Sequence, residues 1–384
     1  MCAPLLPEYD REGGSRRIFY LIELLREAGW AVTFAAENPN GDERYVRTLQ
    51  QRGVAVHQGF GARTKDLFRF GRFDVAIFAF WYLAEGHVSE LRRVSPKTKI
   101  IVDVIDLHWL RNARKHFLPP LRTTRSPGAT VSDPDFSAEM VRELQAYAQA
   151  DAVLTASDKE AETINDLLSK PSLAHTVPSH EESIPATVPF EDRRGILFIG
   201  NFNHPPNLDA VSFFCERILP RIDRRLLAEH PLSIVGQRPP QTVFRYAKTS
   251  PFVRVVGWVP SVFPYLQSTR VSVVPMRYGA GTKTKLLQAL VAHTPTVTTT
   301  IGIEGLNVVP GRDVLLADDA ASFARETERL LTDPELWTGL ADHGSEQVAK
   351  LHSREAVRER LVEVLESKLR RPARSGSGMR AANP

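Results

Sequence analysis

The sequence predicts an α/β protein of two domains, each a doubly wound parallel sheet covered by helices. Short, continuous apolar runs alternate with segments whose apolar residues recur at helical spacing, which is typical of parallel strands with helices on both faces. The alternation breaks once, at residues 178–194, where prolines stand among charged residues. A chain of 384 residues is also longer than one hydrophobic core usually organises. The two sheets would face a cleft, because ligands of such folds bind beyond the carboxyl ends of the strands.

Residues 1–180 are expected to form the N-terminal domain. Only residues 2–6, interrupted by Pro4, can supply its first strand, so this strand is short or the natural protein begins upstream of Met1. A helix follows at 15–28 and ends before Gly29. Further strands are expected at 31–36, 54–57, 74–80, 99–104 and 152–156. Further helices are expected at 44–52, 86–93, 137–150 and from Ser157, where Glu160 would complete a capping box.

After a hinge at 181–194, residues 195–350 are expected to form the C-terminal domain. Its strands are predicted at 195–199, 232–235, 253–256, 271–274, 296–300 and 313–316, and helices at 208–222 and 282–292. A last helical stretch covers 335–369, and its part at 351–370 would pack back on the N-terminal domain. The tail at 371–384 combines basic residues with Gly, Ser and Pro, a composition typical of disorder.

The composition excludes several classes of protein. Cys2 stands at the chain end and Cys215 in an expected helix, so a disulfide framework is not expected and a reducing cytoplasm fits. The chain has no apolar run of the roughly 18 residues that span a membrane, and no secretory signal at its start. Basic and acidic residues, 49 and 45, are interspersed and form no aromatic-interleaved patch, which argues against nucleic acid. The histidines lack metal-ligand spacing, so no metal site is expected.

Residues 271–306 carry the clearest chemical signal. An apolar strand leads into Gly279-Ala280-Gly281, and a helix is expected to open at Thr282. Glycines allow close approach of a ligand, and a helix N-terminus attracts anions. Lys283 and Lys285 stand in the first turn, where the helix dipole favours acidic residues, and this conflict is relieved if an anion binds there. The segment is neither a P-loop nor a dinucleotide fingerprint. The alternative is an ordinary strand–loop–helix connection with solvated lysines.

This segment resembles the donor site of retaining glycosyltransferases of family 4, in the subgroup with Gly-x-Gly-Thr-Lys-x-Lys and a Gly-x-Glu-Gly-Leu ending. The resemblance continues upstream in residues 195–222, with Pro-Asn-x-Asp-Ala at a helix start, and in Gly257-Trp258-Val259. In the first half, residues 7–17 resemble the family's opening loop, and residues 103–114 its segment facing the acceptor. These motifs cover residues 7–306 in the expected order.

The resemblance implies a GT-B architecture with a nucleotide-diphosphate sugar held mainly by the second domain. It further implies transfer with retention to a saccharide, lipid-linked or small-molecule acceptor, without an obligatory metal or other cofactor. The residues implied at the donor phosphates are Gly13, Gly14, Arg277, Gly281, Thr282, Lys283 and Lys285. Those implied at the nucleotide are Gly200, Gly257, Trp258, Val259, Gln288 and Glu304. Relatives often modify lipid-linked acceptors. The resemblance is therefore compatible with a cytoplasmic protein that binds peripherally to the inner face of the membrane.

In the first domain, Asp106 and His108 follow an apolar strand and are the expected catalytic pair, with His108 positioning groups rather than accepting a proton. The expected acceptor residues are Trp81, Tyr82, Arg111 and Arg114. The alternative interpretation makes Asp106 and His108 surface polar residues, the aromatic pair part of the core, and the arginines solvated or ion-paired.

Two departures from the family pattern set the limits of the resemblance. Many relatives carry a glutamate where this chain has Gln288, and a basic pair in the segment 200–207, where only His204 is basic here. We therefore expect a Gln288→Glu change to be tolerated and to tighten donor binding. The alternatives to an active transferase are a degenerate relative that serves as a scaffold for a partner, and a nucleotide-sugar epimerase of similar fold.

Overall fold

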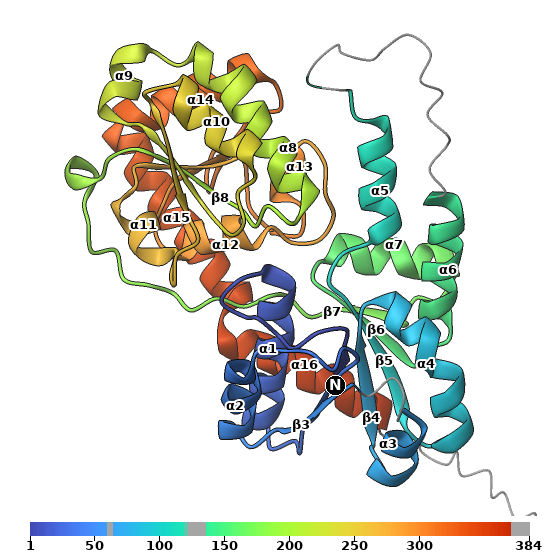
Figure 1. Ribbon diagram of the computed structural model, residues 1–384. Helices are drawn as coiled ribbons and strands as arrows, with labels where there is room; N and C mark the ends of the chain where they lie inside the picture. Colours follow the sequence, from blue (N-terminus) through green and yellow to red (C-terminus); the bar gives the residue numbers. More distant parts are fainter. Residues whose placement is uncertain (60–63, 120, 122–135, 370–384) are drawn as a thin grey trace, which may run out of the picture.

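The computed structural model describes residues 1–59, 64–119, 121 and 136–369, which form two α/β domains (Figure 1). Each domain contains one sheet, of seven and six strands, and every strand pairing in the described part of the chain is parallel. The prediction of two parallel-sheet domains is therefore confirmed. The predicted disordered tail at 371–384 lies outside the described residues.

The N-terminal sheet has the order β3-β2-β1-β4-β5-β6-β7. Its strands are β1 (Cys2–Ala3), β2 (Thr33–Ala36), β3 (Ala55–Gln58), β4 (Val75–Ala79), β5 (Lys99–Val104), β6 (Ala152–Thr155) and β7 (Ala174–Thr176). The central strands β4, β5 and β6 are buried almost throughout, as their continuous apolar sequences require. The helices are α1 (Gly13–Glu27), α2 (Glu43–Gln51), α3 (Thr64–Gly71), α4 (Trp81–Val94), α5 (His108–Phe117), α6 (Phe136–Ala148) and α7 (Asp158–Leu168).

The C-terminal sheet has the order β10-β9-β8-β11-β12-β13. Its strands are β8 (Ile196–Ile199), β9 (Leu232–Val235), β10 (Val253–Gly257), β11 (Val271–Val274), β12 (Thr296–Thr298) and β13 (Leu315–Leu316). The helices around it are α8 (Pro205–Phe213), α9 (Arg224–Glu229), α10 (Gln241–Thr249), α11 (Phe263–Ser268), α12 (Thr284–Val291), α13 (Thr300–Ile303), α14 (Ala320–Thr332) and α15 (Pro334–His352).

Several elements differ from the sequence-based expectation. The first strand is short, because Pro4 follows it directly, and Gly13 and Gly14 form the first turn of α1 rather than a loop. The predicted helix at 208–222 is α8 followed by a π-helical turn, Phe214–Ile218, and a short 3₁₀ turn. Only the N-cap half of the expected capping box is seen: the hydroxyl of Ser157 accepts the Glu160 N–H at 3.3 Å, while the Glu160 carboxylate accepts from the Ser157 hydroxyl and from the Gly281 N–H.

The last helix, α16 (Arg354–Leu369), returns to the N-terminal domain and lies across its helices and sheet (Figure 1). Its buried residues Val357, Leu361, Val364 and Leu365 pack against α1 and against β4 and β5. The chain thus crosses between the domains twice, in the segment after β7 and again between α15 and α16. In the first crossing, the Glu181 N–H donates to the carbonyl of His352, and the Ile184 N–H to that of Val291.

Candidate functional site

A cleft of about 1070 Å³ lies between the two domains, beyond the carboxyl ends of both sheets. Residues that follow strands of both domains line it, for example Asp106 after β5 and Gly200 after β8. The cleft lining includes these residues predicted from the sequence: Gly13, Gly14, Asp106, His108, Arg111, Gly200, Trp258, Val259, Thr282, Lys283, Lys285 and Gln288.

The segment 279–282, here called the glycine loop, lies directly against the N-terminal domain. A Cβ added to Gly281 would stand 2.7 Å from the carbonyl oxygen of Ile105 and 2.9 Å from Cβ of Asp106. The N–H of Gly281 donates to the carboxylate of Glu160 at 3.0 Å, and the hydroxyl of Thr282 donates to the carbonyl of Ala156 at 3.3 Å. Gly281, with φ of 67°, is therefore required for contact between the domains, whereas the sequence suggested contact with a ligand.

Lys283 and Lys285 stand at the start of α12, which begins at Thr284, two residues later than expected. The Lys283 ammonium is enclosed and donates to the carbonyl of Gly281 at 2.6 Å. The Lys285 ammonium donates to the side-chain oxygen of Asn207 and lies 5.0 Å from the centre of the Phe198 ring. Burial lowers the pKa of both lysines, that of Lys285 to about 7. Positive charge here is unfavourable beside the helix dipole, so the site favours an anion.

The start of α1 faces the start of α12 across the cleft. A Cβ on Gly13 would lie 3.0 Å from the hydroxyl oxygen of Thr284, so the two helix N-termini meet closely only because a glycine stands there. Each N-terminus carries a partial positive charge of roughly half a unit and N–H groups without intrahelical partners. Together with the two lysines they make this end of the cleft electropositive.

Asp106, His108 and Arg111 form one cluster on the N-terminal side of the cleft. Nε2 of His108 lies 3.3 Å from one carboxylate oxygen of Asp106, and the Arg111 guanidinium donates to the other. Burial alone would raise the pKa of Asp106, but the His108 contact and the Arg111 charge outweigh it and hold that pKa below its usual range. Asp106 is therefore an ionised acceptor that orients His108 and Arg111.

Glycines also bring the ends of β8 and β9 together. A Cβ on Gly236 would lie 1.8 Å from the carbonyl oxygen of Gly200, so no other residue fits at Gly236. Trp258, after β10, exposes 44% of its surface at the rim of the cleft, while Val259 is buried beneath it. This end of the cleft offers a flat aromatic surface.

Comparison with known proteins identifies the architecture. The family model described as Glycosyl transferases group 1 matches residues 193–333. This range includes the glycine loop and both lysines. No curated protein sequence matches the chain. A sucrose-phosphate synthase from Thermosynechococcus elongatus superposes with a TM-score of 0.72 at 18% identity, over 95% of this chain and 98% of that one. HepE from Anabaena, in complex with UDP and glucose, gives a TM-score of 0.71 at 10% identity over 95% and 98%.

The chain has the GT-B fold. A glycosyltransferase from Rickettsia africae is similar to the same extent, with a TM-score of 0.69 at 11% identity over 94% of this chain and 96% of that one. Of the described residues, no group of three His, Cys, Asp or Glu side chains is arranged to hold a metal ion. Among the helices of the described ranges, none is long and apolar enough to cross a bilayer.

The other predicted site residues do not line the GT-B cleft. Arg277 is paired with Asp209 at 2.9 Å, and Trp81, only 5% exposed, lies in the hydrophobic core. Tyr82 stacks on Phe80 with ring centres 5.4 Å apart. Four further predicted residues are also absent from the cleft lining: Gly257, Arg114, Glu304, and Gly281, which faces Ile105.

Arg114 and Glu304 bind each other across the domain boundary. Both guanidinium nitrogens of Arg114 donate to the Glu304 carboxylate, at 2.6 and 2.8 Å, and Lys159 contacts the same carboxylate. Arg114 also donates to the carbonyl of Gly279 at 2.7 Å. These residues hold the glycine loop against α5 and α7, whereas the sequence suggested separate acceptor and nucleotide contacts.

The structure adds cleft residues that the sequence analysis did not select. His204 and Asn207 line the cleft beside Lys285, and burial lowers the pKa of His204 to about 4, so its ring is neutral at pH 7.

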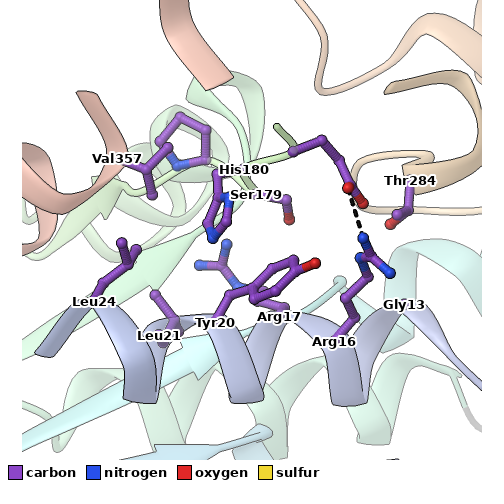
Figure 2. A pocket seen from close by; sticks show the side chains of 12 residues that line it. Gly13, Arg16, Arg17, Tyr20, Leu21, Leu24, Ser179, His180, Thr284 and Val357 are labelled. Atoms are coloured by element: carbon purple, nitrogen blue, oxygen red, sulfur yellow. Dashed lines mark hydrogen bonds and ion pairs between the residues drawn. The ribbon is translucent and has the colours of Figure 1, made fainter. Parts of the chain in front are cut away.

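Glu181 in the hinge accepts from the side chain of Gln288 at 3.1 Å and from Arg16 at 2.7 Å. Figure 2 shows Arg16 pointing from α1 toward this carboxylate, with Thr284 nearby. Only the position of Glu181 in the hinge signalled its role, because its partners are far away in the sequence.

The sequence suggested that Gln288→Glu would be tolerated. The contact between Gln288 and Glu181 instead predicts that this change destabilises the fold. A second buried carboxylate would stand about where the amide nitrogen lies now, 3.1 Å from an oxygen of Glu181. Two carboxylates at this distance cannot both ionise, so the pKa of one would rise in the folded state. The resulting destabilisation is absent below the unfolded-state pKa of about 4.3 and grows as the pH rises toward the folded-state pKa.

We therefore expect Gln288→Glu to lower the melting temperature by about 5 °C or more at pH 8, and by much less at pH 5. Gln241→Glu, at the exposed start of α10, is the matched control and should behave like the wild type. Differential scanning calorimetry at both pH values measures the effect. A melting temperature of Gln288→Glu equal to that of the control at pH 8 would contradict the contact.

Proposed function

We propose that this chain is a retaining glycosyltransferase of family 4 that uses a nucleotide-diphosphate sugar as donor and needs no metal ion. The observation that carries the proposal is a pair of lysines, the buried Lys283 and the half-buried Lys285, at a helix N-terminus that opens into the interdomain cleft. The match to the glycosyl transferases group 1 model over residues 193–333 and the UDP held by the similar HepE fold support it.

In this proposal the electropositive end of the cleft holds the donor diphosphate. Negative charge develops on the leaving diphosphate oxygen as the glycosidic bond to the nucleotide breaks. Lys283, Lys285 and the facing N-termini of α1 and α12 stabilise that charge, which is the electrostatic task that a metal ion performs in other sites. Departure and attack occur on the same face of the sugar. As the acceptor oxygen forms the new glycosidic bond, its proton passes to the leaving diphosphate oxygen, so no strong enzymic base is needed.

The Asp106 cluster positions the other reactant. Asp106 is ionised and holds His108 and Arg111 at the edge of the cleft beyond β5. We assign to His108 the orientation of an acceptor hydroxyl or of the transferred sugar, with a saccharide as the acceptor class, since a HepE complex contains glucose beside UDP. Trp258 supplies the surface on which the nucleotide base stacks.

Replacing both lysines should remove the diphosphate site without unfolding the protein. For Lys283→Ala with Lys285→Ala we expect nucleoside diphosphate affinity to fall by about tenfold or more, because each charge-assisted hydrogen bond contributes roughly 1.5–3 kcal/mol. The melting temperatures of the wild type and the double variant are first measured with UDP, GDP, ADP and dTDP, without added metal. The diphosphate that stabilises the wild type most is then titrated into both proteins by calorimetry. Lys350→Ala, an exposed lysine of α15, is the control. Binding of none of the four diphosphates to the wild type would refute the proposal, and unchanged affinity in the double variant would refute the site.

Diphosphate affinity should also depend on pH through Lys285. Its pKa of about 7 means that the free protein loses this charge as the pH rises above 7. An anion binds the protonated form, so binding above pH 7 requires proton uptake, and affinity should fall by up to about tenfold per pH unit. Titrations between pH 7.5 and 9.5 avoid ionisation of the terminal phosphate, whose pKa is about 6. Lys283, whose pKa burial lowers to about 8, adds its own dependence in this range. Lys285→Arg keeps its charge throughout and should therefore make the dependence less steep by up to about tenfold per pH unit without abolishing it. An equally steep dependence in Lys285→Arg would exclude Lys285 as its source.

A further inference from the structure

The helix that carries His108 begins without a capping side chain of its own. The residue before α5 is Leu107, whose apolar side chain cannot accept a hydrogen bond from the first N–H groups of the helix. All 10 residues of α5 belong to the described ranges, and each of them is half-buried or exposed. Trp109 and Leu110 pack only partly on the core, so polar contacts must fix where the first turn of α5 lies.

A buried carboxylate of the neighbouring helix α6 supplies the missing cap. Figure 1 shows α6 beside α5, and Glu143 of α6 is fully buried between them. One of its oxygens accepts the N–H of His108 at 3.2 Å, and the other accepts the N–H of Trp109 at 3.1 Å. The hydroxyl of Tyr147, one turn further along α6, donates to the same carboxylate at 2.7 Å. Because a negative charge at a helix N-terminus is favourable, the ionised form of Glu143 holds the start of α5.

His108 is thereby held from two sides. Its backbone N–H is bound to Glu143, and its Nε2 lies 3.3 Å from a carboxylate oxygen of Asp106. The second half of α5 is held independently, because Arg114 donates to the carbonyl of Gly279 at 2.7 Å. Loss of the Glu143 contact should therefore release the first turn of α5 while the glycine loop stays bound.

We propose that Glu143 is a positioning residue, whose carboxylate fixes the first turn of α5 so that His108 meets the transferred sugar of the donor. This inference rests on the proposed function and deepens it. Among the described residues, Glu143 is not one that lines the cleft, so it acts through His108 rather than by touching a substrate.

Ionisation of Glu143 gives the contact a pH signature. Burial raises the pKa of Glu143 to about 7, although the hydrogen bonds from Tyr147, Trp109 and His108 favour the charged form. The backbone N–H of Trp109 should therefore exchange a neutral acceptor for an ionised one as the pH rises through 7.

Other titratable groups surround this carboxylate. Those that act on it or on the Tyr147 hydroxyl bound to it are His108 of α5, Asp106 after β5 and Glu160 of α7. On α4, which also packs on α6, Glu85 is paired with the exposed Arg142. Burial raises the pKa of Glu160 to about 7 as well, so a variant is needed to assign the signature to Glu143.

The first test follows the acceptor of the Trp109 N–H by NMR. Nitrogen-15-labelled tryptophan marks the 5 tryptophans of the chain, and Trp109→Phe assigns the backbone signal. We expect this signal to titrate with a midpoint near pH 7 in the wild type and to lose that titration in Glu143→Gln. Glu85→Gln, which removes a carboxylate bound to the surface of α6, is the matched control and should titrate like the wild type. Equal titration in the wild type and Glu143→Gln would overturn the contact.

The second test separates positioning from a merely structural role. UDP, GDP, ADP and dTDP and the corresponding nucleotide-glucose compounds are titrated by calorimetry at pH 8 into the wild type, Glu143→Gln and the control. His108 affects only the ligand that carries a sugar. We therefore expect Glu143→Gln to bind the nucleotide-glucose about fivefold or more weakly, and the diphosphate within about twofold of the wild type. An equal loss for both ligands, or no loss, would overturn the positioning role.

A second variant covers the case in which Glu143→Gln does not fold. Tyr147→Phe removes only the hydroxyl that favours the charged carboxylate, so the midpoint of the Trp109 titration should move to higher pH. An unchanged midpoint would overturn the assignment to Glu143 while the proposed function stands. Absence of binding of every nucleotide to the wild type would overturn the proposed function, and the role of Glu143 in transfer with it.

Discussion

The glycine loop of the C-terminal domain is pressed against the strand ends of the N-terminal domain, and the shape of the cleft follows from this contact. Glu160 accepts the Gly281 N–H, Thr282 donates to Ala156, and Arg114 donates to Gly279. A side chain at Gly281 would separate the two domains, since its Cβ would lie 2.7 Å from a carbonyl oxygen. The loop is thus held by groups of the other domain, and the anion site is complete only when both domains are in contact.

Closure has an electrostatic consequence. It encloses Lys283 and partly encloses Lys285 at a helix N-terminus, where burial and the helix dipole both oppose positive charge. The same contact brings the start of α1 so near Thr284 that a Cβ on Gly13 would lie 3.0 Å from its hydroxyl oxygen. An anion between the two helix starts would relieve this accumulation of positive charge, so in the proposed function we expect binding of the donor and contact between the domains to stabilise each other.

The sheets were predicted well, because strands such as β4 and β5 are continuous apolar runs. A run of this kind can be recognised from neighbouring residues alone, without knowledge of the tertiary contacts. The sequence-based prediction missed α10, although Val243, Tyr246 and Ala247 follow helical spacing, and it missed α14, where Phe323, Ala324 and Leu330 do so. Site residues predicted from a local pattern, such as Lys283, line the cleft. The partners of Glu181 and of Arg114 lie 107 to 190 residues away, and no local pattern reveals such contacts.

The most direct measurement is a crystal structure of the protein with UDP, or with whichever nucleoside diphosphate binds more tightly. We expect the diphosphate to lie between the starts of α1 and α12, with Nζ of Lys285 about 3 Å from a phosphate oxygen. A diphosphate bound elsewhere on the protein, with the cleft between the two helix starts left to solvent, would contradict it.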